Sequence, residues 1–146
     1  MSDNFQAWLD EALHALIVDR RRSLPELLAA YDALEAQAVG ALSKEPNELL
    51  VKVQRELASL RLTAAKQRGG SALDAVRLFA RCEQLGYSSG EARVMATSIF
   101  AQMCLSDGQP ELARAKLDGV LLSVPRGKYP RIEDLARELH AAKQRQ

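Results

Sequence analysis

Residues 94–106 read VMATSIFAQMCLS, and this stretch decides the fold. It contains no charged residue, although 27% of the chain is charged. Its apolar residues are spread around most sides of a helix, and such a helix must be covered by other elements on most sides. The stretch is too short, and too rich in Ser, Thr and Gln, to span a bilayer. We therefore predict that it is the central helix of a small stack of helices.

The composition predicts a single all-α domain over residues 1–146. This length suits one domain with a sizeable core. Leu, Ala, Glu, Arg and Gln, which favour helices, fill most of the chain, and no stretch alternates apolar with polar residues over the length of a strand. The formal net charge of +1 gives no overall field that would attract nucleic acid or an anionic membrane. We expect neither of them as a partner on this ground.

Capping and turn signals divide the chain into about seven helices. Ser23, Ser71 and Ser88 are each followed three residues later by an acidic residue, which is the pattern of an N-terminal capping box. The expected helices span about residues 4–20, 23–42, 46–67, 71–85, 88–106, 110–124 and 130–142. We group them as an N-terminal hairpin (residues 1–44), a repeat region (45–125) and a linker with a capping helix (126–146).

Apolar residues at spacings of three and four predict the buried side of the first and third helices. In the first helix they are Phe5, Trp8, Leu9, Ala12, Leu13, Leu16 and Ile17. In the third helix they are Leu50, Val53, Leu57, Leu60 and Ala64, in the manner of a short coiled-coil seam. An antiparallel hairpin with the second helix explains that seam better than a separate dimer zipper, because the connecting loop is short.

Two stretches of the chain align at an offset of 38 residues. After Gly70 come Ala72, Ala75, Phe79 and Cys82, and after Gly108, at the same spacings, come Pro110, Ala113, Leu117 and Val120. A small residue followed one turn later by a large one has a physical reason in a pair of helices. The small residue lets the partner backbone approach closely, and the large one fills the gap beside it. The pattern therefore predicts two related helical hairpins.

At these residues the chain resembles the tetratricopeptide repeat family, which stacks helix–turn–helix units of about 34 residues. The second copy matches the family pattern at Gly108, Ala113, Leu117 and Pro125, and the first copy matches it at Gly70, Ala75 and Phe79. Other positions depart from the pattern: Phe100-Ala101 and Leu62-Thr63 stand for Leu-Gly, and Cys104 and Lys66 stand for Tyr. The resemblance covers about residues 55–125. It implies a right-handed superhelix of antiparallel hairpins that ends in a capping helix.

The resemblance also implies a concave groove lined by the first helix of each hairpin. The partner-binding residues would then be Met95, Ser98 and Gln102 in the second copy and Leu57, Leu60 and Ala64 in the first. Such a mildly apolar groove suits a partner helix. Family members that clamp a C-terminal carboxylate use Lys, Asn and Arg on this face, which the three positions of the second copy lack, so no such clamp is expected. Alternatively, the N-terminal hairpin fills the groove and these residues are core.

The sequence gives no sign of an enzyme, a metal site or a cofactor. His14 and His140 lie at opposite ends of the chain among charged residues, and no group of ligand residues has zinc spacing. Gly69-Gly70 follows no strand and precedes no Gly-Lys-Ser/Thr, so it is a helix end rather than a phosphate loop. Cys82 and Cys104 fall on apolar helix faces and are expected to be reduced and buried.

The leading hypothesis is a non-catalytic protein–protein interaction module, an adaptor or small dedicated chaperone that holds a partner segment in a helical groove. Small chaperones of bacterial secretion systems are one version, by analogy of size and fold alone. The first alternative is a self-associating structural or regulatory protein, a homodimer through residues 23–67 or 94–106. The second is a nucleic-acid-linked accessory protein that uses the basic clusters at residues 20–22 and 126–131. The N-terminus has no basic region followed by an apolar run, so we expect a cytoplasmic protein.

Overall fold

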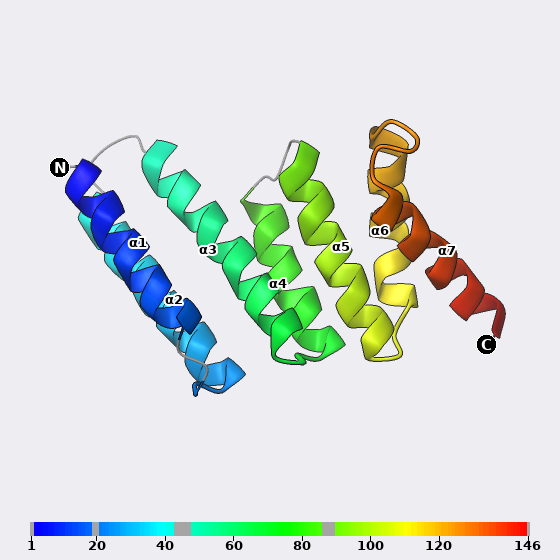
Figure 1. Ribbon diagram of the computed structural model, residues 1–146, viewed down its shortest axis with the longest axis horizontal. Helices are drawn as coiled ribbons and strands as arrows, with labels where there is room; N and C mark the ends of the chain where they lie inside the picture. The colour runs from blue at the N-terminus through cyan, green and yellow to red at the C-terminus, as the bar shows by residue number, and fades with distance from the viewer. Residues whose placement is uncertain (1, 19–20, 43–47, 86–89, 146) are drawn as a thin grey trace. The chain divides into compact units, whose positions relative to one another are not determined.

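The computed structural model describes residues 2–18, 21–42, 48–85 and 90–145, and within these ranges it is all-helical, with seven helices and no strand (Figure 1). The helices are α1 (Ser2–Val18), α2 (Leu24–Leu42), α3 (Glu48–Gln67), α4 (Ala72–Gln84), α5 (Gly90–Ser106), α6 (Glu111–Ser123) and α7 (Pro130–Arg145). The all-α prediction is confirmed. Two predicted signals, the helix end at Gly86 and the capping residue Ser88, lie outside the described residues.

The described helix starts follow the capping signals. The Ser71 hydroxyl accepts a hydrogen bond from the Asp74 N–H (3.2 Å), and the Ser71 N–H donates to the Asp74 carboxylate (2.9 Å). This reciprocal pair satisfies two N–H groups that the first turn of a helix cannot satisfy itself. At α2, the Ser23 hydroxyl accepts from the Glu26 N–H at 3.3 Å.

The chain divides into two compact units, Met1–Leu57 and Ala58–Gln146, and the boundary falls inside α3. In the first unit α1 packs against α2. Its buried side chains are Leu9, Leu13, Leu16, Leu27, Tyr31, Leu34, Ala38, Val53 and Leu57. The predicted stripe on α1 was too wide, because Trp8 and Ile17 are 38% and 58% exposed. Each is one residue away from a buried leucine, a rotation of about 100° around the helix.

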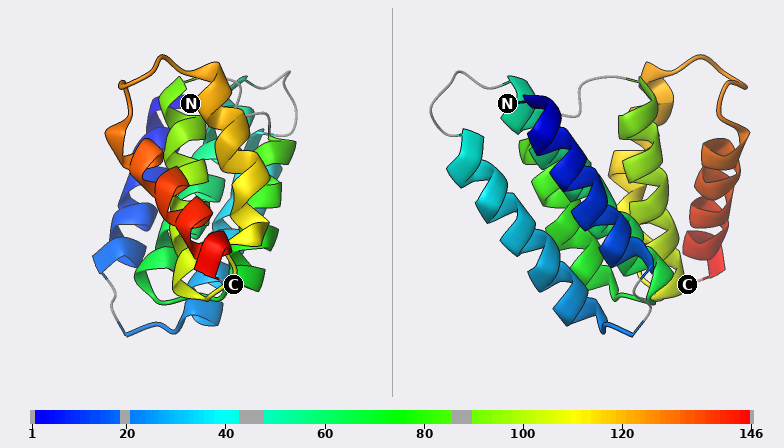
Figure 2. Two further views of the ribbon diagram at one scale, coloured as in Figure 1. Left: turned by 90° about the vertical axis from the view of Figure 1, so that its right-hand side faces the viewer. Right: turned by 60° about the vertical axis from the view of Figure 1, so that its left-hand side comes forward.

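In the second unit α5 is the central helix, as its charge-free sequence predicts. It packs against α4, α6 and α7, and α6 also packs against α7 (Figure 2). Phe100 is 1% exposed and Met103 is 3% exposed. The ring of Phe100 stacks on that of Phe79 from α4, with centroids 4.7 Å apart. On α7 the predicted apolar face is buried, and it consists of Ile132, Leu135, Ala136 and Leu139.

All eight aligned repeat positions are buried. They are Ala72, Ala75, Phe79 and Cys82 at α4, and Pro110, Ala113, Leu117 and Val120 at α6. The alignment of the turn glycines needs a correction. The left-handed residue before α4 is Gly69 (φ +69°), not Gly70, and its counterpart is Gly108 (φ +67°). The turns are therefore offset by one residue relative to the buried faces.

Candidate functional site

The exposed side of α5 carries three of the predicted partner-binding residues. Met95 is 58% exposed, and Ser98 and Gln102 are half-buried. Spacings of three and four place them on one side of the helix, and the Gln102 amide nitrogen donates a hydrogen bond to the Ser98 hydroxyl (3.0 Å). We call these three residues the α5 strip. Because neighbouring helices cover most of α5, the strip is its main accessible surface.

A pocket of about 460 Å³ lies at the Gln102 end of the α5 strip. Its lining residues are Lys66, Gly69, Gly70, Ser71, Gln102, Met103, Ser106 and Asp107. The pocket joins the last turn of α3 and the turn before α4 to the end of α5. Its side chains include an exposed ammonium, an amide and a hydroxyl, which can bind a polar group of a partner.

The start of α4 beside this pocket already holds two carboxylates of the chain itself. Asp107 accepts a hydrogen bond from the Ala72 N–H at 2.8 Å, and Asp74 accepts one from the Ser71 N–H. The backbone hydrogen bond from Ser71 lowers the pKa of Asp74, against the smaller effect of its burial. The helix terminus that would attract a phosphate is therefore satisfied internally, in keeping with Gly69-Gly70 being a helix end.

Both cysteines are free and buried. Burial raises the pKa of the Cys104 thiol to about 11, and the charge of Asp107 adds to this rise. A thiol with this pKa stays protonated at neutral pH, and the thiolate is the nucleophilic form. Cys104 therefore lacks the properties of a catalytic nucleophile.

The predicted partner-binding residues on α3 differ in exposure from those on α5. Leu57, in the first unit, and Ala64, in the second, are buried, and Leu60 is half-buried. Buried side chains offer a partner no accessible surface, so the accessible part of the predicted set consists of the α5 strip and part of Leu60. Partner binding at the three α3 positions stays a prediction.

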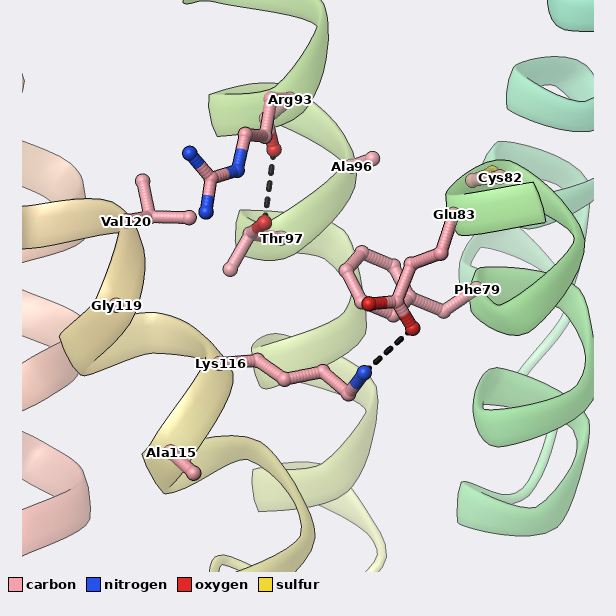
Figure 3. A pocket seen from close by; sticks show the side chains of 10 residues that line it. All are labelled: Phe79, Cys82, Glu83, Arg93, Ala96, Thr97, Ala115, Lys116, Gly119 and Val120. Atoms are coloured by element: carbon pink, nitrogen blue, oxygen red, sulfur yellow. Dashed lines mark hydrogen bonds and ion pairs between the residues drawn. The ribbon is translucent and has the colours of Figure 1, made fainter. Parts of the chain in front are cut away.

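A second surface, which sequence reasoning missed, lies between α4 and α6 with α5 as its floor (Figure 3). This α4–α6 groove has a volume of about 410 Å³ and is lined by Phe79, Cys82, Glu83, Arg93, Ala96, Thr97, Ala115, Lys116, Gly119 and Val120. Lys116 bridges its two sides: the ammonium pairs with the Glu83 carboxylate and lies 5.2 Å from the centre of the Phe79 ring. The sequence signal was a second apolar series on α6, Leu112, Ala115, Gly119 and Leu122, beside the buried one.

The other candidate groups are structural or solvated where they are described. Among the described residues, no group of three His, Cys, Asp or Glu side chains could hold a metal ion. His140 lies 3.5 Å from the Asp118 carboxylate at the surface. In the basic cluster at residues 126–131, the Glu133 carboxylate accepts a hydrogen bond from the Gly127 N–H (2.7 Å), which lowers the positive charge of the loop.

No protein-family model matches the chain, and neither the curated proteins nor the solved structures include a significant match to it. Within the described ranges, the helices are too short or too polar to cross a membrane.

Proposed function

We propose that the protein is a non-catalytic protein–protein interaction module, an adaptor or small chaperone that holds a segment of a partner protein. The α5 strip is the observation that carries this proposal. A helix that is otherwise surrounded by α4, α6 and α7 presents an exposed methionine and two hydrogen-bonding side chains on one side. Methionine is flexible and polarizable, which suits a surface that adapts to a partner segment.

The dimensions of the strip suit a short peptide segment. From Met95 to Gln102 the helix rises by about 10 Å, since each residue adds about 1.5 Å, and the pocket at its end adds the Lys66 ammonium and the Ser106 hydroxyl. We propose that the partner packs an apolar side chain on Met95 and places a polar side chain in this pocket. The partner would thus be a helical or extended segment with one apolar and one polar anchor, one or two turns apart.

We further propose that the second unit is a tetratricopeptide-like stack of antiparallel hairpins in a right-handed superhelix, with α7 as its capping helix. The burial of the eight aligned positions supports this arrangement, as does the shared backbone geometry of the turns at Gly69 and Gly108. The free, buried thiols of Cys82 and Cys104 suit a reducing compartment, and we propose the cytoplasm. We propose no enzymatic role and no cofactor, because the side chains around both hollows form no arrangement of nucleophile and base.

Affinity capture from an extract of the native organism, followed by mass spectrometry, tests the α5 strip. Wild-type protein is compared with a Met95→Glu/Gln102→Ala variant, and Leu122→Glu, on α6, is the matched control. We expect a partner that is retained by the wild type and the control and is lost from the strip variant. Equal retention by all three proteins would overturn the assignment of this surface.

A further inference from the structure

Helix α6 has an apolar face that nothing in the second unit covers. Leu112 is 45% exposed and Leu122 is 90% exposed, and between them lie Ala115 and Gly119. The series has spacings of three, four and three, so its members share one side of the helix. The opposite side of α6 is the buried repeat face with Leu117. Two exposed leucines at the ends of one helix face mark an interaction surface.

Gly119 is not required by the fold of a single chain. It lies in the interior of α6, where glycine is a poor helix former. A Cβ atom built at this position meets no atom within 4 Å. The missing side chain therefore makes no room for another part of this chain. It makes room outside α6, along the wall of the α4–α6 groove, where the backbone of a second helix could approach closely.

The spacing of this face identifies the second helix. Leu112 and Leu122 lie five residues on either side of Leu117, and Ala115 and Gly119 lie two residues on either side of it. When two such helices pack antiparallel about a two-fold axis at Leu117, each leucine meets the other leucine of the second copy, and Ala115 meets Gly119. An isologous interface requires this self-complementarity. We propose that the protein forms a homodimer in which α6 packs antiparallel against α6 of a second copy.

The α4–α6 groove offers a place for the end of the second helix. The Ala72 N–H bond to Asp107 and the Lys116–Glu83 ion pair show that α4 and α6 begin at the same end of the unit and run in the same direction. Val76 and Leu112 each lie about one turn before the contact between Lys116 and the Phe79 ring. Leu122 of the second copy would reach the apolar surface that these two side chains share.

The charges beside this face permit the approach of a second copy. A two-fold axis brings each Lys116 near the other Lys116, but each ammonium is paired with Glu83 of its own chain. On the other edge Asp118 is paired with His140 in the same way. The face of one helix is small for a protein interface, so we expect a weak dimer whose population rises with protein concentration. This dimer uses a different surface from the α5 strip and does not depend on the proposed partner binding.

Sedimentation equilibrium at several protein concentrations tests the dimer. We expect a monomer–dimer equilibrium for the wild type, a monomer for Leu122→Glu and unchanged dimerisation for Met95→Glu. Because Leu122 is 90% exposed, its substitution should leave the fold intact, which the helical circular dichroism spectrum checks. A monomer at all wild-type concentrations, or a dimer that Met95→Glu weakens as much as Leu122→Glu does, would overturn the proposal. Partner capture by Leu122→Glu separates this result from a failure of the proposed function.

Disulfide trapping tests the register. An equimolar mixture of the Ala115→Cys and Gly119→Cys variants should form the mixed disulfide faster than either variant alone forms its own, because the antiparallel register places position 115 opposite position 119. The native Cys82 and Cys104 are buried and should not compete. If the two variants cross-link at random, or do not cross-link at all while the wild type dimerises, the proposed register is wrong.

Discussion

The turn between α3 and α4 and the turn between α5 and α6 end one helix alike and begin the next one differently. In each, a left-handed glycine is followed by a residue whose N–H donates to the carbonyl five residues earlier: Gly70 to Ala65 and Gln109 to Cys104, both at 2.7 Å. This is the Schellman end of a helix. The helix starts differ, because Ser71 caps α4 with its side chain, whereas Pro110 makes no side-chain cap at α6.

The difference shows that a repeated buried face does not require a repeated turn. The first buried position follows its left-handed glycine by three residues at Ala72 and by two at Pro110. The longer connection carries the capping box, and the shorter one uses the fixed φ of proline to enter the helix. Packing therefore preserves the offset of 38 residues between side chains, while each connection adjusts its own length. Substitutions in both copies can break or sharpen this comparison.

The largest effect is expected where the two buried faces are filled. Phe79→Ala should lower the free energy of unfolding by about 3–5 kcal/mol, and Leu117→Ala by about 2–5 kcal/mol, since each leaves a cavity. Urea unfolding followed by circular dichroism measures both. Leu122→Ala, on the exposed side of α6, is the control and should change the value by less than about 0.5 kcal/mol at concentrations where the protein is monomeric. A loss at Leu122 equal to that at Leu117 would mean that α6 is turned the other way.

The small residues of the two faces come next. Ala75 and Ala113 are both fully buried, so Ala75→Leu and Ala113→Leu should each destabilise the protein by about 1–3 kcal/mol through overpacking. Ala115→Leu places the same side chain on the exposed side of α6 and should leave the stability of the monomer nearly unchanged. Melting temperatures of the three variants give the comparison. If only one of the buried positions responds, the two copies do not pack equivalently.

The turn glycines should respond less strongly. Gly69→Ala and Gly108→Ala should each cost about 1–2 kcal/mol, because a Cβ atom is disfavoured at their left-handed φ angles. Gly119→Ala should instead stabilise the monomer by about 0.5–1 kcal/mol, since its Cβ meets nothing within 4 Å in a helix interior. Chemical denaturation distinguishes the two signs. A larger loss for Gly70→Ala than for Gly69→Ala would restore the alignment that the sequence suggests.

The smallest effect belongs to the cap that only the first copy has. Ser71→Ala should cost about 1 kcal/mol. Folding lowers the pKa of Asp74 from its ordinary 3.8, so its carboxylate stabilises the folded state above that pH. This contribution is lost as the pH falls through the lower, folded-state value. The stability difference between the wild type and Asp74→Asn should therefore be present at neutral pH and should shrink as the pH falls below about 4. Denaturation series at both pH values measure it, and a difference that grows on acidification would contradict the assignment.

The elements with regular patterns could be predicted from the sequence. The charge-free stretch of α5, the capping box at Ser71 and the small residue Ala113 each reflect local chemistry or one face of one helix, and all are found as expected. The errors arise where position depends on neighbours. Trp8 belongs to an apolar stripe but lies largely beside the contact with α2, and Gly69 and Gly70 are adjacent glycines whose φ angles the sequence does not distinguish.

The candidate surfaces were predicted only in part for the same reason. Met95, Ser98 and Gln102 share one side of a helix, which spacing alone reveals, and that side is the accessible one. Leu57 and Ala64 were chosen by the same rule, but their burial depends on what packs around them. The α4–α6 groove is formed by helices that are more than 30 residues apart in sequence, so no local pattern describes it. Only Leu112 and Leu122, which are apolar without being buried, gave an indication of it.

The hydrogen bond from the Ala72 N–H to Asp107 joins residues 35 positions apart and makes one hairpin supply the cap of the preceding helix. The two hairpins are therefore not interchangeable modules. A truncated chain that ended before Asp107 would leave the first turn of α4 with an unsatisfied N–H, and α4 would fray from that end. Any attempt to excise, duplicate or transplant one hairpin of this protein has to carry that aspartate with it.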